Sequence, residues 1–506
     1  MKLLVASSTD AMLWTWLREY RPRRQEWQLL VKAGRGGRGL ARHVAQIHRS
    51  RAASFSTDLA RLSRARKRQR YTRAVILCNN NTGDGYDRIR QQAQALAAQV
   101  ELVMLDGRRL LPDQARREDR RARALVRALR THARPRIGID CRTWSPWCAG
   151  IGDYVANTVR RVVRLMPDAE FILYQTVQSG AVATGRNVHV ATAPEIRLNL
   201  AEEQAYYRQA AGHDLDLFHA TGPFGPTRRF CPTVLTLHDL SQLRHPEYFY
   251  PDRVAHFHRV IRPMLRAADA VVTDSCAIAD EAAAAYRVPQ RKLLTLPLAA
   301  TVTPVRGTIR PPYGLRPGYL LYVGTIEPRK NLAQLVDALV PLWRSGAVRQ
   351  PLVLAGKRGW LQDDLLARIA RIPQVRWLGY VPAADLPALM GGAGMFIYLS
   401  RYEGFGLPVA NAMACGVPVI TTPDGALGEV AGDAAMLVDP DDGKGLRTAL
   451  LRVQRDANWR RELIARGRAR VREYSWSANA RALTELYRLL LTARGAQKKQ
   501  CGKNGR

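Results

Sequence analysis

The chain has 506 residues, with 78 Lys or Arg against 43 Asp or Glu, so its formal net charge is +35. This length allows about two to four domains, and a hydrophobic content of 47% excludes a mainly disordered protein. No apolar run reaches the roughly 18–20 residues of a membrane-spanning helix, and the start of the chain turns polar too early for a secretory signal. The seven cysteines form no Cys-x-x-Cys pair, so we expect a cytoplasmic protein without a structural zinc site.

The positive charge is concentrated at the two ends of the chain. Residues 1–136 hold 31 Lys+Arg against 11 Asp+Glu, and 494–506 hold five Lys+Arg and no acid. Such segments suit an anionic partner, either acidic phospholipid or nucleic acid, although an arginine-rich solvated surface explains them equally well. The first segment has few aromatic residues and no recognisable nucleic-acid-binding module, so we expect no nucleic acid partner and favour a membrane surface.

Residues 1–136 read as a basic amino-terminal region with a weak α/β pattern. We expect strands at 74–78 and 100–105, a turn at 79–85 and a helix from about Tyr86. The segment Gly34–Gly39 matches G-x-G-x-x-G and Asp58 follows Gly39 by 19 residues, but the segment carries two arginines and a lone match of this kind is a weak signal. A flexible basic loop therefore explains it better than a dinucleotide site.

From residue 137 onward, short apolar runs alternate with helical periodicity, which is typical of parallel sheets covered by helices. A Pro- and Gly-rich linker at about 301–317 separates two such series, so we predict Rossmann-like domains at 137–304 and 305–493, with a disordered basic tail at 494–506. Ligands bind such sheets at the carboxyl ends of the strands. The predicted strands are 136–140, 217–220, 233–237, 270–273, 319–323, 352–355, 375–378, 395–399 and 418–420.

Two glycine turns in the second domain suit a phosphorylated ligand. In Ser400–Pro408, Glu403 follows a strand, glycines permit close approach, and a helix that begins near Leu407 offers free N–H groups to an anion. In Gly324–Leu332, the adjacent cations Arg329 and Lys330 precede a helix near Asn331 and suit a pyrophosphate. Taken singly, the first segment is better explained as a plain turn with a solvated acid, and the second is equally well explained as a solvated basic pair before a helix.

The first domain has weaker candidates. Gly150 and Gly152 form a short glycine loop before an amphipathic helix. His238 follows strand 233–237, where a ligand-contacting and a structural histidine are equally plausible, and His219 has the same ambiguity with less weight.

Together these segments resemble glycosyltransferase family 4, a retaining family with the GT-B fold, and more narrowly its bacterial mannosyltransferase A-like members of surface polysaccharide biosynthesis. The resemblance covers about 137–490 and nothing before 136. It rests on seven ordered segments, namely 137–140 with 150–152, 237–246, 322–332, 354–357, 379–381, 403–408 and 429–435.

The resemblance implies a role for each matching position. Arg329 and Lys330 would hold the donor diphosphate and stabilise its departure, while His238 would approach the transferred sugar. Gly150 and Gly152 would let the first-domain loop close over the diphosphate, without a bound metal or other cofactor. The remaining donor contacts would come from Glu403, Phe405, Gly406 and Leu407, from Gly324, and from Gly379, Tyr380 and Val381 beside the base.

One position departs from the family pattern. The second acid expected eight residues after Glu403 is Asn411 here. In the family that acid accepts hydrogen bonds from the ribose hydroxyls, and Asn keeps one acceptor oxygen but loses the charge. We therefore expect weaker or altered donor binding with the chemistry retained.

The resemblance predicts a glycosyltransferase that moves mannose from GDP-mannose, with retention, to a lipid-linked or oligosaccharide acceptor. The basic segments predict peripheral attachment to the inner face of the cytoplasmic membrane. A catalytically lapsed scaffold in a polysaccharide assembly complex is the alternative, suggested by Asn411 and the extra amino-terminal region.

Overall fold

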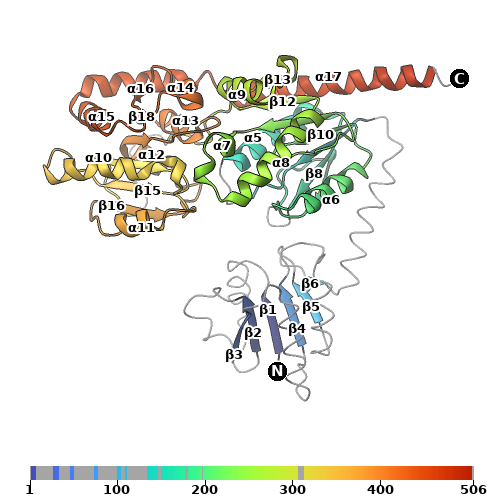
Figure 1. Cartoon of the computed structure of the whole chain (residues 1–506), viewed down its shortest axis with the longest axis horizontal. Coiled ribbons are helices and arrows are strands. Elements are labelled where there is room, and N and C mark those ends of the chain that lie inside the picture. The colour runs from blue at the N-terminus through green and yellow to red at the C-terminus, as the bar shows by residue number, and fades with distance from the viewer. Residues whose placement is uncertain are drawn as a thin grey trace. The chain divides into compact units, whose positions relative to one another are not determined.

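The computed structural model divides the chain into two compact units, one mostly within Met1–Arg134 and the other mostly within Pro135–Arg506 (Figure 1). It describes 134–145, 150–176, 180–196, 198–305 and 313–503, with side chains to 493 in the last helix. Within 1–133 it describes the backbone of six strands. The Gly34–Gly39 segment, the turn at 79–85 and the helix expected from Tyr86 lie outside the described residues.

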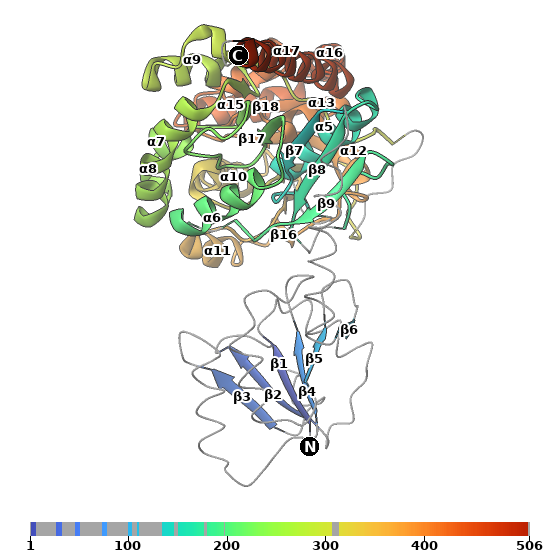
Figure 2. The ribbon, with the colours of Figure 1, turned by 90° about the vertical axis from the view of Figure 1, so that its right-hand side faces the viewer.

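The amino-terminal unit contains a six-stranded sheet in the order β3-β2-β1-β4-β5-β6 (Figure 2). Its strands are parallel except for β6, which pairs antiparallel with β5. The strands expected near 74–78 and 100–105 are present, so this region carries a sheet of its own. The strands are β1 (Lys2–Ala6), β2 (Trp27–Lys32), β3 (Gln46–Ser50), β4 (Arg73–Leu77), β5 (Val100–Val103) and β6 (Arg109–Leu110).

The first Rossmann-like domain has a seven-stranded sheet in the order β13-β12-β11-β10-β7-β8-β9. β7 and β10–β12 are wholly buried, as expected for strands with helices on both faces. Its strands are β7 (Arg136–Asp140), β8 (Glu170–Gln175), β9 (Val188–Thr192), β10 (Leu217–Ala220), β11 (Thr233–Leu237), β12 (Ala270–Thr273) and β13 (Leu293–Thr295). Its helices are α5 (Ile151–Leu165), α6 (Leu200–Ala211), α7 (Ser241–Arg244), α8 (Pro251–Ala267) and α9 (Cys276–Tyr286).

The second domain has a six-stranded parallel sheet in the order β16-β15-β14-β17-β18-β19. The strand order reverses between β14 and β17, which makes this the switch point where ligands bind such sheets. Its strands are β14 (Tyr319–Val323), β15 (Leu352–Ala355), β16 (Val375–Gly379), β17 (Ala393–Tyr398), β18 (Val419–Thr421) and β19 (Met436–Leu437). Its helices are α10 (Leu332–Arg344), α11 (Asp363–Ile369), α12 (Leu386–Gly391), α13 (Leu407–Ala414), α14 (Gly425–Ala431), α15 (Gly443–Arg455) and α16 (Ala457–Val471).

The last helix, α17 (Trp476–Lys503), returns to the first domain, where it packs against α5 (Figure 1). The Trp476 indole N–H donates to the Ala300 carbonyl at 3.1 Å, and the Asn479 amide donates to the Leu296 carbonyl at 3.0 Å. The prediction of disorder from residue 494 differs from the structure, in which the helix continues to Lys503. Each residue added to an established helix adds a backbone hydrogen bond, so the helix extends beyond its packed part.

Among the described residues, no helix combines the length and the apolar character needed to cross a membrane. The long α17 is no exception, because charged side chains such as Arg481, Glu485 and Arg488 recur along it.

Candidate active site

The switch point of the second domain brings together two cations and two carboxylates. Lys330 and Arg329 lie in a short 3-10 turn after β14, and Glu403 lies in the loop after β17. Arg329 donates to Glu403 at 3.1 Å and to Glu327 at 2.7 Å, and Lys330 forms an ion pair with Glu403. The structure therefore joins the two segments that the sequence singled out.

Burial and charge together set the protonation of this cluster. Burial alone raises the pKa of Glu403, but the facing Arg329 and Lys330 lower it from 4.5 to about 2. The two carboxylates raise the pKa of Arg329 against the effect of burial. Glu403 is therefore an ionised hydrogen-bond acceptor at neutral pH, and it cannot serve as an acid there.

Tyr398, at the end of β17, forms hydrogen bonds to two members of the cluster, Lys330 and Glu403. The Lys330 ammonium donates to its hydroxyl at 3.0 Å, and that hydroxyl donates to Glu403 at 2.9 Å. The Arg329 and Glu403 side chains each keep 12% exposure. The cations are thus fixed in place but remain reachable by an anionic ligand.

Two glycines in the 403–407 loop have a steric reason to be glycine. A Cβ on Gly404 would lie 1.8 Å from the His238 carbonyl oxygen, so only glycine lets this loop meet the first domain. Gly406 has φ of 107° and precedes α13, which begins at Leu407 as predicted. Phe405 is buried, with its ring edge-on to Tyr474 at 5.5 Å.

The predicted base-side residues follow β16. Gly379 ends the strand with φ of 70°, and Val381 is buried. The Lys357 ammonium lies 4.8 Å from the centre of the Tyr380 ring, so the loop after β15 supplies a cation beside this aromatic face. Gly324, after β14, also has little space, because a Cβ there would lie 2.8 Å from the Tyr322 hydroxyl.

His238 lies after β11 and has both ring nitrogens engaged. Nδ1 lies 2.7 Å from an Asp274 carboxylate oxygen, and Nε2 lies 2.9 Å from the Thr221 carbonyl oxygen. Its side chain keeps 11% exposure, so His238 lies at the edge of the site with its orientation fixed.

The glycine loop of the first domain differs from its prediction. Gly150 has φ of 65° and precedes α5, whereas Gly152 is buried inside the first turn of that helix. The helix therefore starts earlier than expected, and Gly152 is a helix residue rather than part of a closing loop.

Asn411 is buried on α13 and pairs with Thr301, at the start of the linker between the two domains. The Thr301 N–H donates to Asn411 Oδ1 at 2.7 Å, and the Asn411 amide donates to the Thr301 hydroxyl at 3.0 Å. The residue that departs from the family pattern therefore joins α13 to the linker.

His219 is a core residue. Its ring nitrogens lie 2.7 Å from the Thr236 hydroxyl and 2.5 Å from the Tyr487 hydroxyl, and burial followed by the charge of His238 lowers its pKa to about 3. It stays neutral and links α17 to the first sheet.

The sequence analysis missed four residues that complete the site, namely Glu327, Tyr398, Asp274 and Thr301. Asp274 and Glu327 had a usable signal, because each is an acid at or just beyond the carboxyl end of a predicted strand. Thr301 had none, because its partner Asn411 is distant in sequence, whereas Tyr398 was counted only as a strand residue although Glu403 lies five residues on.

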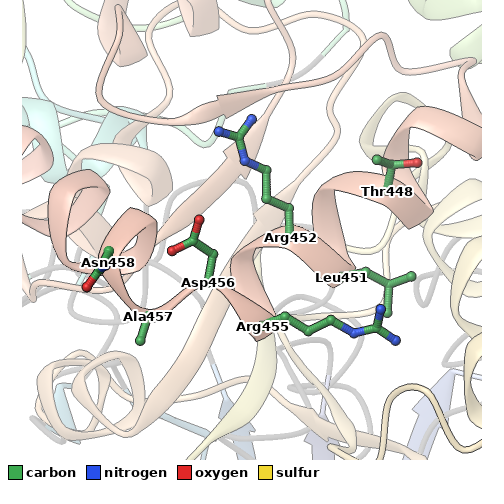
Figure 3. A pocket seen from close by; sticks show the side chains of 7 residues that line it. All are labelled: Thr448, Leu451, Arg452, Arg455, Asp456, Ala457 and Asn458. Carbon is green, nitrogen blue, oxygen red and sulfur yellow. The ribbon is translucent and has the colours of Figure 1, made fainter.

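A surface hollow of about 770 Å³ lies elsewhere in the second domain, between α15 and α16 (Figure 3). Its lining includes Arg452 and Arg455 but none of the residues described above. Within the described part of the chain, no group of three or more His, Cys, Asp or Glu side chains is placed to hold a metal ion.

Comparison with known proteins agrees with this geometry. Residues 306–470 match the family "Glycosyl transferases group 1", and 148–299 match "Glycosyltransferase Family 4". The chain is 36% identical over 287 residues to the O-antigen chain mannosyltransferase B of Escherichia coli, covering 54% of this chain and 74% of that protein.

Two further comparisons extend this result. The serotype-specific mannosyltransferase WbdA of Escherichia coli is 28% identical over 51% of this chain, which spans only 34% of that protein's length. Sucrose-phosphate synthase from Thermosynechococcus elongatus shares the fold, with a TM-score of 0.58 and 21% identity over 71% of this chain and 100% of its own. The two-domain fold, the cation cluster and these matches show that the chain belongs to glycosyltransferase family 4, with the GT-B architecture.

Proposed function

We propose that this glycosyltransferase moves mannose from GDP-mannose, with retention, to a lipid-linked or oligosaccharide acceptor in surface polysaccharide biosynthesis. The observation that carries the proposal is the Arg329–Lys330–Glu403 cluster at the switch point of the second domain. The choice of mannose is supported by the mannosyltransferase relatives.

In this proposal Arg329 and Lys330 bind the donor diphosphate. Transfer breaks the bond between the anomeric carbon and the phosphate oxygen, and forms a bond to an acceptor hydroxyl oxygen, whose proton passes to the departing diphosphate oxygen. Negative charge grows on the leaving diphosphate, and the two cations are already held in place by Glu327, Glu403 and Tyr398. Preorganised charge of this kind lowers the barrier without a reorganisation cost, and the proposal needs no resident metal.

The neighbouring elements fit the rest of the donor. Tyr380 and Lys357 offer an aromatic face and a cation for the base, and the N-terminus of α13 offers free N–H groups. Glu403 is left as an ionised acceptor for sugar hydroxyls once the diphosphate engages its cations. Asn411 hydrogen-bonds to Thr301, so in this proposal it connects α13 to the start of the linker between the two domains.

We further propose that the enzyme acts at the inner face of the cytoplasmic membrane. The support is the charge of residues 1–136 and 494–506, which would gain roughly 1 kcal/mol per Lys or Arg close to an anionic leaflet. Binding to vesicles that contain anionic lipid, reversed by high salt, is the expected result.

A donor screen tests the central proposal. Thermal shift and transfer assays with GDP-, UDP- and dTDP-sugars should single out GDP-mannose, and the anomeric configuration of the product reads retention directly. Turnover of a different sugar nucleotide would replace the proposed donor. Absence of both binding and turnover across the panel, with lipid acceptor supplied, would favour the non-catalytic scaffold.

A further inference from the structure

The side chain of His238 is held between two hydrogen-bond acceptors. The Thr221 carbonyl oxygen, 2.9 Å from Nε2, can only accept, so Nε2 carries a proton. The Asp274 carboxylate lies 2.7 Å from Nδ1 on the opposite side of the ring. An ionised carboxylate also only accepts, so the ring satisfies both contacts only when both nitrogens are protonated.

The burial of Asp274 beside His238 is energetically unfavourable in itself, because one of its carboxylate oxygens has no hydrogen-bond partner in the part of the chain that the structure describes. It follows β12, its side chain is 4% exposed, and its second oxygen, Oδ1, is buried with no hydrogen-bond partner among the described residues. Buried polar atoms in proteins are nearly always paired, and exceptions are concentrated where a residue has a functional task. A carboxylate that served packing alone would gain nothing from this arrangement.

The loop that carries Asp274 also contacts the second domain. The Ser275 hydroxyl donates to the Gly404 carbonyl at 2.8 Å, directly beside Glu403. The Glu429 carboxylate of α14 accepts the backbone N–H groups of Cys276 and Ala277, at 3.0 and 3.1 Å, where α9 begins. Four consecutive residues, 274–277, therefore orient His238 and meet the second domain's glycine loop and α14.

The surrounding groups favour a charged ring. Burial opposes the charge, but Asp274, the Thr221 carbonyl and the neighbouring Asp239 raise the pKa of His238 above its ordinary value. Burial also raises the pKa of Asp274, against the attraction of His238. His219 on β10 is neutral, the Tyr154 ring of α5 lies edge-on to the His238 ring with centroids 5.0 Å apart, and the Gly404 backbone lies against the His238 carbonyl.

We propose that Asp274 is a positioning residue that holds His238 as a doubly protonated imidazolium, oriented toward the donor-sugar side of the cleft. His238 then supplies a fixed positive charge in the first domain, because its two N–H groups are engaged by Asp274 and the Thr221 carbonyl. It does not remove the proton of the acceptor hydroxyl. The role of His238 in sugar transfer rests on the proposed function. The double protonation of its ring beside Asp274 does not depend on that function.

Nuclear magnetic resonance of the full chain with ¹⁵N-labelled histidine tests the clamp without any substrate. The His238 signals are assigned by their loss in His238→Gln. In the wild-type protein both ring nitrogens should be protonated at about pH 7, where an ordinary histidine, with a pKa of about 6.5, is mostly neutral. A neutral His238 ring in the wild type at that pH would overturn the proposal by itself.

The variant Asp274→Asn keeps the shape of the side chain and removes its charge. The ring should then lose its second proton at a pH lower by about 1–3 units. The control Asp239→Asn removes a charge that contacts Ser241 rather than the ring and raises the pKa of His238 less than Asp274 does, so it should shift the ring titration less than Asp274→Asn. An unchanged ring titration in Asp274→Asn would contradict the assignment.

The activity readout separates positioning from a merely structural role. The rate of the wild-type enzyme should fall as the pH rises through the raised pKa of His238, and in Asp274→Asn this fall should shift to lower pH by the same amount as the ring titration. A loss of rate that is equal at every pH would make Asp274 structural. If no sugar nucleotide is turned over at all, the proposed function fails, while the resonance experiment still decides the clamp.

Discussion

Two buried clusters of arginine and carboxylates lie at the carboxyl ends of the two sheets, and they differ in exposure. In the first domain, Arg142 donates to Asp140 and Glu203 at 2.9–3.1 Å and stacks over the Tyr206 ring at 3.7 Å. Its side chain is 0% exposed. In the second domain, Arg329 pairs with Glu327 and Glu403 but keeps 12% exposure.

The difference in exposure shows that arginine–carboxylate pairing can either join structural elements or prepare cations for a ligand. Arg142 has carboxylates on both sides of its guanidinium and no access for a ligand, so its cluster joins α6 to the end of β7. Arg329 and Lys330 lie at the topological switch point, where glycines keep the backbone open and an incoming anion can compete for the cations. A buried ion pair therefore does not by itself identify a ligand-binding site. The distinguishing feature is that the paired side chains at the end of the strand remain partly exposed.

The largest expected effect comes from opening the sealed cluster. Arg142→Met leaves Asp140 and Glu203 as uncompensated buried charges, and should lower the free energy of unfolding by about 3–5 kcal/mol. Urea denaturation followed by fluorescence measures this. The matched control Arg229→Met breaks an exposed pair with Asp269 and should cost about 0–1 kcal/mol. Equal effects of the two variants would remove the distinction between sealed and exposed pairs.

The next effect is on catalysis. Lys330→Met keeps the alkyl stem and removes the charge from the open cluster, so the rate of transfer should fall about 100- to 1,000-fold. The urea midpoint should move less than in Arg142→Met, because Arg329 still pairs with Glu403. Lys444→Met, the same substitution at an exposed position of α15, should leave the rate unchanged. A Lys330→Met enzyme that is unfolded rather than slow would make this cluster structural as well.

The smallest effect is a dependence of stability on pH. The pKa of Glu403 is lowered from 4.5 to about 2 in the folded protein, so its stabilising contribution is complete above about pH 4.5 and is lost as the pH falls toward 2. The difference in the free energy of unfolding between the wild type and Glu403→Gln should be constant from about pH 7 to 5 and shrink below that. A difference that stays constant to pH 3 would show that Glu403 is not held by its cations.

The fold was largely predictable because parallel strands have a simple sequence signal. The strands at 319–323 and 352–355 are short apolar runs that are buried on both faces, and they were placed correctly. In the two Rossmann-like domains β8, β9, β13 and β19 were missed, although the apolar run 171–174 of β8 carries the same signal as the strands that were found. The predicted disordered tail from residue 494 differs from the structure, because its basic composition suggested disorder where the established helix α17 continues.

The candidate site was predictable only in part, because a sequence displays neighbours along the chain. Arg329, Lys330 and Glu403 were found from glycine turns at strand ends. Asp274 was not, because its value lies in a contact with His238, 36 residues away. The ribose contact expected for Asn411 stays a prediction, since its side chain faces Thr301 in the structure.

The sequence alone determined the family, the two parallel sheets and the placement of two cations and an acid at strand ends. These features depend on local patterns of hydrophobicity, glycine and charge, which are written in consecutive residues. The tertiary structure decided which charges are sealed and which are reachable, and how His238 is clamped. Burial and pairing between distant segments arise only when the sheets and helices pack, so no reading of neighbouring residues supplies them.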